Sequence, residues 1–102
     1  MSNPVKKLIC NNSVIALNTS FHEANTLSLL DGRQQVEGAA IQAKYCEQAI
    51  EVLGSECHDV NSLAAEATDL LKSGRLPDAE EGKLIRLDDW FIAEMKGILL
   101  PA

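Results

Sequence analysis

The stretch from Arg33 to Leu53 is apolar along two opposite sides. In an α-helix of about 3.6 residues per turn, alternating spacings of three and four keep residues on one side. One such set comprises Val36, Ala39, Ala43, Cys46, Ile50 and Leu53. The opposite set comprises Gly38, Ile41, Tyr45, Ala49 and Val52. Since a helix with two apolar sides needs two neighbours, we predict a central helix over 33–53 with one side left for another polypeptide.

The C-terminal apolar positions also exceed what one core needs. They fall within a stripe about 160° wide on a helix over about 79–99: Leu84, Leu87, Phe91, Ile92, Met95, Ile98 and Leu99. Asp78 and Glu81 form a capping box that begins this helix. Asp88 lies inside the stripe, where we expect it to pair with a lysine, an arginine or a backbone donor at the edge of the bundle. The alternative is a contact between Asp88 and an arginine of a partner.

Polar capping residues mark two further helices. Ser20 and Glu23 form a capping box ahead of a helix over about 21–31. Another helix is expected over about 60–73, with Asn61 or the serine after it as the N-cap. Glycines at the ends of three helices suit their C-terminal caps: Gly32, Gly54 and Gly74.

Residues 1–19 are predicted to form an N-terminal arm. Two short β-prone runs, Val5–Cys10 and Ser13–Leu17, flank an Asn-Asn pair. Because asparagine tolerates positive φ, these runs are compatible with a hairpin. An extended arm packed on the helices or on another subunit is the alternative.

The composition agrees with a helical core. The chain has 102 residues, of which 46% are hydrophobic and only 4% aromatic, so the core is aliphatic and rich in alanine. Such a core favours helix packing over a β-sandwich. We therefore predict one domain over 1–102, of the all-α class: a bundle of three to four helices with a short N-terminal arm or hairpin. The spare apolar side predicts a homodimer.

Charge and cysteine content restrict the partners. A net charge of −6 disfavours direct binding to nucleic acid, because an acidic surface repels phosphates. The apolar runs are too short for a membrane span, and the N-terminus lacks the apolar core of a signal peptide. Three cysteines at wide spacings do not form a disulfide framework, so we expect reduced thiols in a cytoplasmic protein.

The sequence offers little that resembles catalytic chemistry. Cys57, His58 and Asp59 are adjacent, but a nucleophile and its base must be neighbours in space rather than in sequence. A zinc site normally has paired ligands at short spacing, which this sequence lacks, so a metal at Cys57 and His58 is a weak alternative. We expect a polar loop here, no enzymatic activity, and no catalytic, cofactor-binding or metal-binding residues.

The candidate site is instead a protein interface. Tyr45 and Trp90 are residue types that anchor interfaces, because each joins an apolar ring to a hydrogen-bond donor. Small residues around Tyr45 would let another helix approach closely. Core packing within one bundle would produce the same pattern, so both interpretations stay open for the aromatics. The predicted partner-binding residues are Gly38, Ile41, Tyr45, Ala49, Val52, Trp90 and Ile98.

Two segments resemble a known group of proteins. GAAIQAKYCEQAIEVL (Gly38–Leu53) and WFIAEMKGILL (Trp90–Leu100) are similar to small pseudomonad helical proteins grouped as a domain of unknown function, the QslA-like quorum-sensing anti-activators. The resemblance covers half of the chain and consists of alanine and leucine spacing. It implies a helical dimer that binds the ligand-binding domain of a LuxR-type transcription regulator. Binding would block dimerisation of that regulator and its attachment to DNA.

Our leading hypothesis is therefore a non-enzymatic inhibitor that occupies the oligomerisation surface of a transcription regulator. One alternative is a phage-type, anti-CRISPR-like inhibitor of a nucleic-acid machine, which would use acidic groups to imitate phosphates. Another is a small helical adaptor of unknown partner. A small enzyme that uses Cys57 and His58 ranks last.

Overall fold

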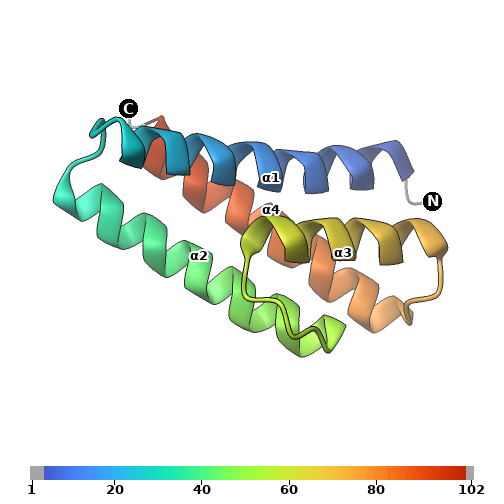
Figure 1. Cartoon of the computed structure of the whole chain (residues 1–102). Coiled ribbons are helices and arrows are strands. Elements are labelled where there is room, and N and C mark those ends of the chain that lie inside the picture. The colour runs from blue at the N-terminus through green and yellow to red at the C-terminus, as the bar shows by residue number, and fades with distance from the viewer. Residues whose placement is uncertain (1–3, 101–102) are drawn as a thin grey trace.

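Four helices make up the architecture (Figure 1). The computed structural model describes residues 4–100, with side chains from residue 13 onward. The helices are α1 (Pro4–Thr26), α2 (Gly32–Leu53), α3 (Val60–Ser73) and α4 (Asp78–Leu99). No strand occurs within residues 4–100, so the prediction of an all-α bundle is confirmed. Residues 1–3 of the predicted arm lie outside the described part.

The N-terminal prediction is wrong, because α1 is one continuous helix of 23 residues. Val14, Asn18 and Phe21 are buried at spacings of four and three, so one side of the segment packs against the bundle. This packing outweighs the low helix propensity of asparagine and β-branched residues. Ser20 consequently lies inside α1 and caps nothing. The helix ends ahead of Ser28, which adopts φ 59°, rather than at Gly32.

The ends of α2 have well-defined caps. Asp31 Oδ1 accepts from the backbone N–H of Gln34 at 2.8 Å, and Gln34 Oε1 accepts from the backbone N–H of Asp31 at 2.9 Å. This reciprocal pair is a capping box that the sequence analysis did not identify. At the other end Gly54 has φ 65°, which favours glycine and ends the helix at the predicted position.

The caps of α3 and α4 depart from expectation in detail. Asp59, rather than Asn61 or Ser62, is the N-cap of α3, and its carboxylate accepts from the backbone N–H of Ser62 at 3.0 Å. Pro77 precedes α4 without a side-chain cap among the described residues, so the capping box predicted at Asp78 is not formed. Proline there still suits a helix start, because its φ is already helical.

The helices pack in a cyclic order. Both α1 and α2 pack against α3 and α4, while α1 and α2 lie diagonally opposite each other. Helix α3 is the shortest and covers only part of the length of α2 (Figure 1). The core contains mostly aliphatic side chains from all four helices, together with Phe21, Tyr45 and Phe91. No helix within residues 4–100 has the length and hydrophobicity needed to cross a membrane.

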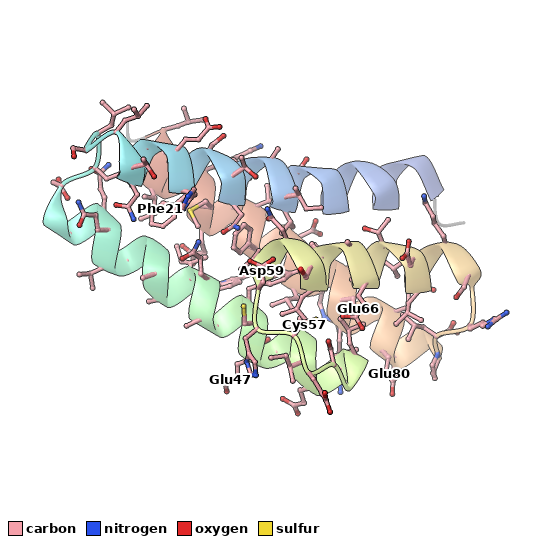
Figure 2. All side chains as sticks on the ribbon, viewed as in Figure 1. Phe21, Glu47, Cys57, Asp59, Glu66 and Glu80 are labelled. Atoms are coloured by element: carbon pink, nitrogen blue, oxygen red, sulfur yellow. The ribbon has the colours of Figure 1, made fainter. Side chains whose placement is uncertain are left out.

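Helices α1 and α2 meet where Phe21 packs against Gly38. Figure 2 shows Phe21 extending from α1 toward α2. A Cβ built on Gly38 would overlap the ring atoms Cε1 and Cζ of Phe21. The ring is almost fully buried, so it has little room to move aside. Glycine at position 38 is therefore required by the close approach of these two helices.

We predict that Gly38→Ala destabilises the protein. Overpacking against Phe21 costs about 1–3 kcal/mol, and the better helix propensity of alanine returns up to about 1 kcal/mol. We expect a net loss of about 1–2 kcal/mol in urea unfolding. Gly97→Ala is the matched control, because Gly97 lies in α4 with open space at its Cβ position. That variant should be about 0.5–1 kcal/mol more stable than wild type. Equal effects of the two substitutions would contradict the close contact.

Candidate functional site

The side of α2 that was expected to meet another chain lies inside the bundle. Gly38, Ile41, Tyr45 and Ala49 are buried, and Val52 is half-buried. The Tyr45 ring packs edge-on against Phe91 of α4, with the ring centroids 5.2 Å apart. These residues therefore form the intramolecular face of α2. The side of α2 that we predicted to bind another chain is thus the side that packs in the core.

The remaining predicted contact residues belong to α4. Ile98 is buried. Trp90 is half-buried, and the ammonium group of Lys44 lies 4.6 Å from the centroid of its ring. This cation–π contact joins α2 to α4 at the surface. Trp90 and Ile98 line one shallow depression between these helices, whereas Tyr45 faces the interior.

The other apolar side of α2 is accessible. Val36 is 70% exposed, Ala39 and Ala43 are exposed, and Cys46, Ile50 and Leu53 are half-buried. On a helix these residues lie opposite the buried side. We call this set the outer face of α2: Val36, Ala39, Ala43, Cys46, Ile50 and Leu53. The prediction that α2 has more apolar surface than its own core uses is thus confirmed, on the opposite side from the one proposed.

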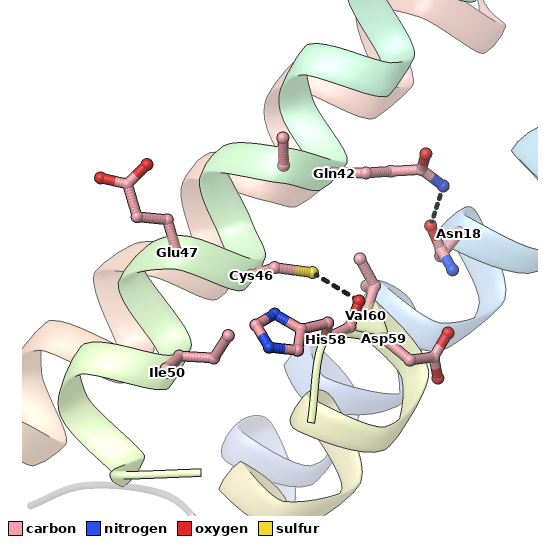
Figure 3. A pocket seen from close by; sticks show the side chains of 9 residues that line it. Asn18, Gln42, Cys46, Glu47, Ile50, His58, Asp59 and Val60 are labelled. Carbon is pink, nitrogen blue, oxygen red and sulfur yellow. Dashed lines mark hydrogen bonds between the residues drawn. The ribbon is translucent and has the colours of Figure 1, made fainter. Parts of the chain in front are cut away.

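An open groove of about 650 Å³ runs beside the outer face (Figure 3). Ala43, Cys46, Glu47 and Ile50 line it from α2, and His58 to Val60 line it from the start of α3. In Figure 3 the imidazole of His58 lies beside Cys46 and Ile50. The groove exists because the connection from α2 to α3 folds back along α2 and covers only its C-terminal half.

Polar side chains close the inner end of the groove. Asn18 of α1 accepts from the amide of Gln42 at 2.7 Å and donates to the side-chain oxygen of Asn61 at 3.1 Å. Asn18 is buried, so both of these bonds satisfy groups that water cannot easily reach. The chain Gln42–Asn18–Asn61 holds the diagonal pair α1 and α2 and the start of α3 at fixed positions. The groove therefore has a rigid wall.

Cys57, His58 and Asp59 do not form a catalytic arrangement. Asp59 is occupied as the cap of α3, and Cys57 is exposed in the connection. The backbone oxygen of His58 lies 3.6 Å from the sulfur of Cys46, which donates a weak hydrogen bond to it. Burial raises the pKa of the Cys46 thiol, with a further contribution from Asp59. Within the described part of the chain, no three metal-ligating side chains are grouped closely enough to hold a metal ion.

A buried carboxyl group is the least expected feature of the core. Asp88 is 1% exposed and accepts a hydrogen bond from the hydroxyl of Tyr45 at 3.0 Å. Its second oxygen, Oδ2, has no hydrogen-bond partner among the described residues. The lysine, arginine or backbone donor that we predicted for Asp88 at the bundle edge is not the partner observed. Tyr45 takes that role from inside the bundle.

Burial dominates the ionisation of this pair. It raises the pKa of Asp88 to about 7, the hydrogen bond from Tyr45 lowers that pKa, and the charge of Asp89 raises it. Burial also raises the pKa of Tyr45, and the neighbouring Asp88 adds to this increase. Tyr45 therefore stays protonated and can donate its hydrogen bond, while Asp88 changes its charge near neutral pH. Sequence periodicity placed Asp88 inside the apolar stripe but could not identify Tyr45 as its donor.

We predict that Asp88 makes the stability depend on pH. The pKa of Asp88 is raised in the folded state above its ordinary value of 3.8, so unfolding releases a proton between those two values. The contribution of this group to stability is therefore greatest below about pH 4 and falls as the pH rises from there through about 7, by on the order of 4 kcal/mol in total. The free energy of unfolding of Asp88→Asn should change less between pH 5.5 and 8 than that of wild type.

Glu94→Gln is the control, because Glu94 is an exposed carboxylate on α4 that does not contribute to the raised pKa of Asp88. This variant should keep the pH dependence of wild type over the same range. If Asp88→Asn and wild type show the same pH dependence, the buried carboxyl group is not the titrating group. Tyr45→Phe adds a second test, because loss of its hydrogen bond should move the transition to higher pH.

The comparisons with known proteins add no further assignment. No protein-family model, no curated protein and no solved structure matches this chain.

Proposed function

We propose that this chain is a non-enzymatic protein-binding inhibitor whose docking surface is the outer face of α2. One observation carries the proposal: α2 is apolar on the side opposite its core, and that side is accessible from Val36 to Ala43. Exposed contiguous apolar surface of this kind is typical of interaction sites. A helix of another protein is the expected occupant, because apolar residues at spacings of three and four suit packing of helix against helix.

The dimensions and surroundings of the face support a helical occupant. Ala39 and Ala43 have short side chains, which let a second helix approach α2 closely. The adjacent groove adds room for one larger apolar side chain beside Cys46 and Ile50. Glu47 and Asp59 stand at the rim of the groove, so basic residues flanking the apolar anchor would complement it. The outer face thus favours an amphipathic helix with basic flanks.

The resemblance to quorum-sensing anti-activators suggests the identity of the partner. We propose a LuxR-type regulator, with its dimerisation surface as the docked region. A regulator held as a single subunit cannot place two DNA-binding units on paired half-sites, so its affinity for the operator falls. No group in the site takes part in a chemical reaction under this proposal.

Light scattering with the purified ligand-binding domain of a LuxR-type regulator tests this function. We expect wild type to convert the regulator dimer into a complex that contains one regulator subunit. Ala43→Glu places a charge in the centre of the outer face, and it should weaken binding by more than about tenfold, or ~1.4 kcal/mol. Fluorescence anisotropy of operator DNA should report release of the regulator by wild type but not by this variant.

Ala16→Glu is the matched control, because Ala16 is exposed on α1, diagonally opposite α2. It introduces the same charge and should bind as wild type does. Binding should also persist as salt increases, whereas an imitation of phosphate would lose affinity steeply. If Ala43→Glu binds as tightly as wild type, the outer face is not the docking surface. If wild type leaves the regulator dimeric, the proposed partner is wrong.

A further inference from the structure

We propose that the shallow depression between α2 and α4 binds an arginine side chain of a partner polypeptide, which stacks on Trp90 in place of Lys44. None of the outer-face residues lines this depression, so the inference does not rest on the proposed function. Three observations carry it: the shape and apolar floor of the depression, the ammonium group that already occupies the indole ring, and the carboxylates beside that ring.

The depression lies where α2 and α4 run side by side in opposite directions (Figure 1). The helices are joined at one end by the side-chain amide of Gln34, which donates to the backbone oxygen of Ile98 at 3.0 Å. The depression has a volume of about 420 Å³, which is ample for one long side chain. Its apolar lining comes from Ala40, Ile41, Trp90 and Ile98. Three of the partner-binding residues predicted from the sequence thus meet here.

The indole ring of Trp90 already holds a cation. The Nζ atom of Lys44 lies 4.6 Å from the ring centroid, a distance at which the negative face of the ring attracts an ammonium group. Lys44 is exposed, and at an exposed site this attraction contributes only about 0.5–1 kcal/mol. Ordering a long, flexible lysine side chain opposes it with a comparable loss of entropy. A competing cation can therefore displace Lys44 from the ring.

Lys44 and Trp90 also line a second depression, of about 560 Å³, between the same two helices. The contact between them therefore separates two hollows of one groove. Displacement of the Lys44 side chain would open the ring of Trp90 to a ligand. Glu47 lies three residues after Lys44 on α2, so the displaced ammonium group has a surface carboxylate within reach.

Carboxylates from both helices line the first depression. Glu94 of α4 has no ion-pair partner among the described residues. Glu37 of α2 pairs with Arg33 at 2.9 Å, but this pair is on the surface and contributes little. Once Lys44 has left the ring, the remaining charged groups of the lining are these two carboxylates. An incoming cation is therefore complementary both to the ring and to its surroundings.

Arginine suits this site better than lysine does. Its guanidinium group is planar and weakly hydrated, so it stacks on an aromatic ring while its N–H groups point outward toward carboxylates. Its three methylene groups can lie along the apolar floor. An incoming lysine would only exchange one ammonium group for another, whereas an arginine gains stacking and a forked set of donors.

The indole N–H signal of Trp90 in an NMR spectrum tests the site, because the chain has a single tryptophan. The isotope-labelled full chain is titrated with N-acetylarginine amide and, separately, with N-acetylcitrulline amide at constant ionic strength. Citrulline has nearly the same shape as arginine but no charge. We expect the arginine derivative to shift this signal with a Kd at least about threefold lower than that of the citrulline derivative. Equal dissociation constants, or no shift with arginine, would overturn the inference.

Matched variants test the competition by Lys44. Lys44→Met keeps an unbranched side chain but removes the ammonium group, so it should bind the arginine derivative about threefold more tightly than wild type does. Lys83→Met is the control, because it removes the same charge from the neighbouring depression, and its affinity should stay close to that of wild type. If both lysine variants change the affinity equally, Lys44 does not compete for the ring and the inference is wrong.

Glu94→Gln tests the carboxylates. This variant should weaken binding of the arginine derivative by about threefold and leave binding of the citrulline derivative unchanged, because only the former carries a charge. An equal effect on both derivatives would contradict a role for the carboxylate in recognising the cation. Binding of the regulator through Ala43 is measured separately, so either proposal can fail while the other holds.

Discussion

The rotation of α2 about its own axis is the constraint on which the rest of the structure depends, and Tyr45 fixes it. The Tyr45 ring fills space against Phe91, and its hydroxyl donates the hydrogen bond that Asp88 accepts. Turning α2 over would expose this ring and leave both oxygens of a buried carboxyl group without a donor. Such a loss costs on the order of 1–3 kcal/mol for each polar group, beyond the lost apolar burial. The same rotation brings Gly38 beneath Phe21 of α1.

Because Tyr45 faces the interior of the bundle, the outer face of α2 lies toward solvent. Its alanines give up little by exposure, because a small side chain has little apolar area to bury. Exposure of Val36 and Ile50 costs more free energy, because their side chains are larger. The connection before α3 reduces this cost by covering part of Ile50. This division explains why the groove lies at the C-terminal half of α2 and why the open surface lies at the N-terminal half. An interaction surface and a stable core therefore coexist on one helix.

The core also contains a group that does not favour stability at neutral pH. A carboxyl group with one unpartnered oxygen is costly to bury, and its raised pKa measures that cost. Polar groups in cores can specify one arrangement among several of similar packing. The hydrogen bond from Tyr45 to Asp88 is of this kind, because it joins α2 to α4 and depends on their present register.

Local sequence signals were sufficient for the positions of three helices. The apolar periods of α2, α3 and α4, together with Gly54 and Gly74, located these elements because the relevant interactions lie within a few residues of each other. They were not sufficient for α1. Its β-branched and asparagine residues are helical because Val14 and Phe21 pack against other elements, and no short window contains those contacts.

The sequence by itself determined that α2 has two apolar sides and that one small bundle uses only one. Only the tertiary structure decided which side is buried. Periodicity reports the direction of side chains around a helix axis, but it does not report what occupies the space in each direction. That choice came from long-range partners: Phe21 for Gly38, and Phe91 with Asp88 for Tyr45. The surface available to another protein is the side that these contacts left exposed.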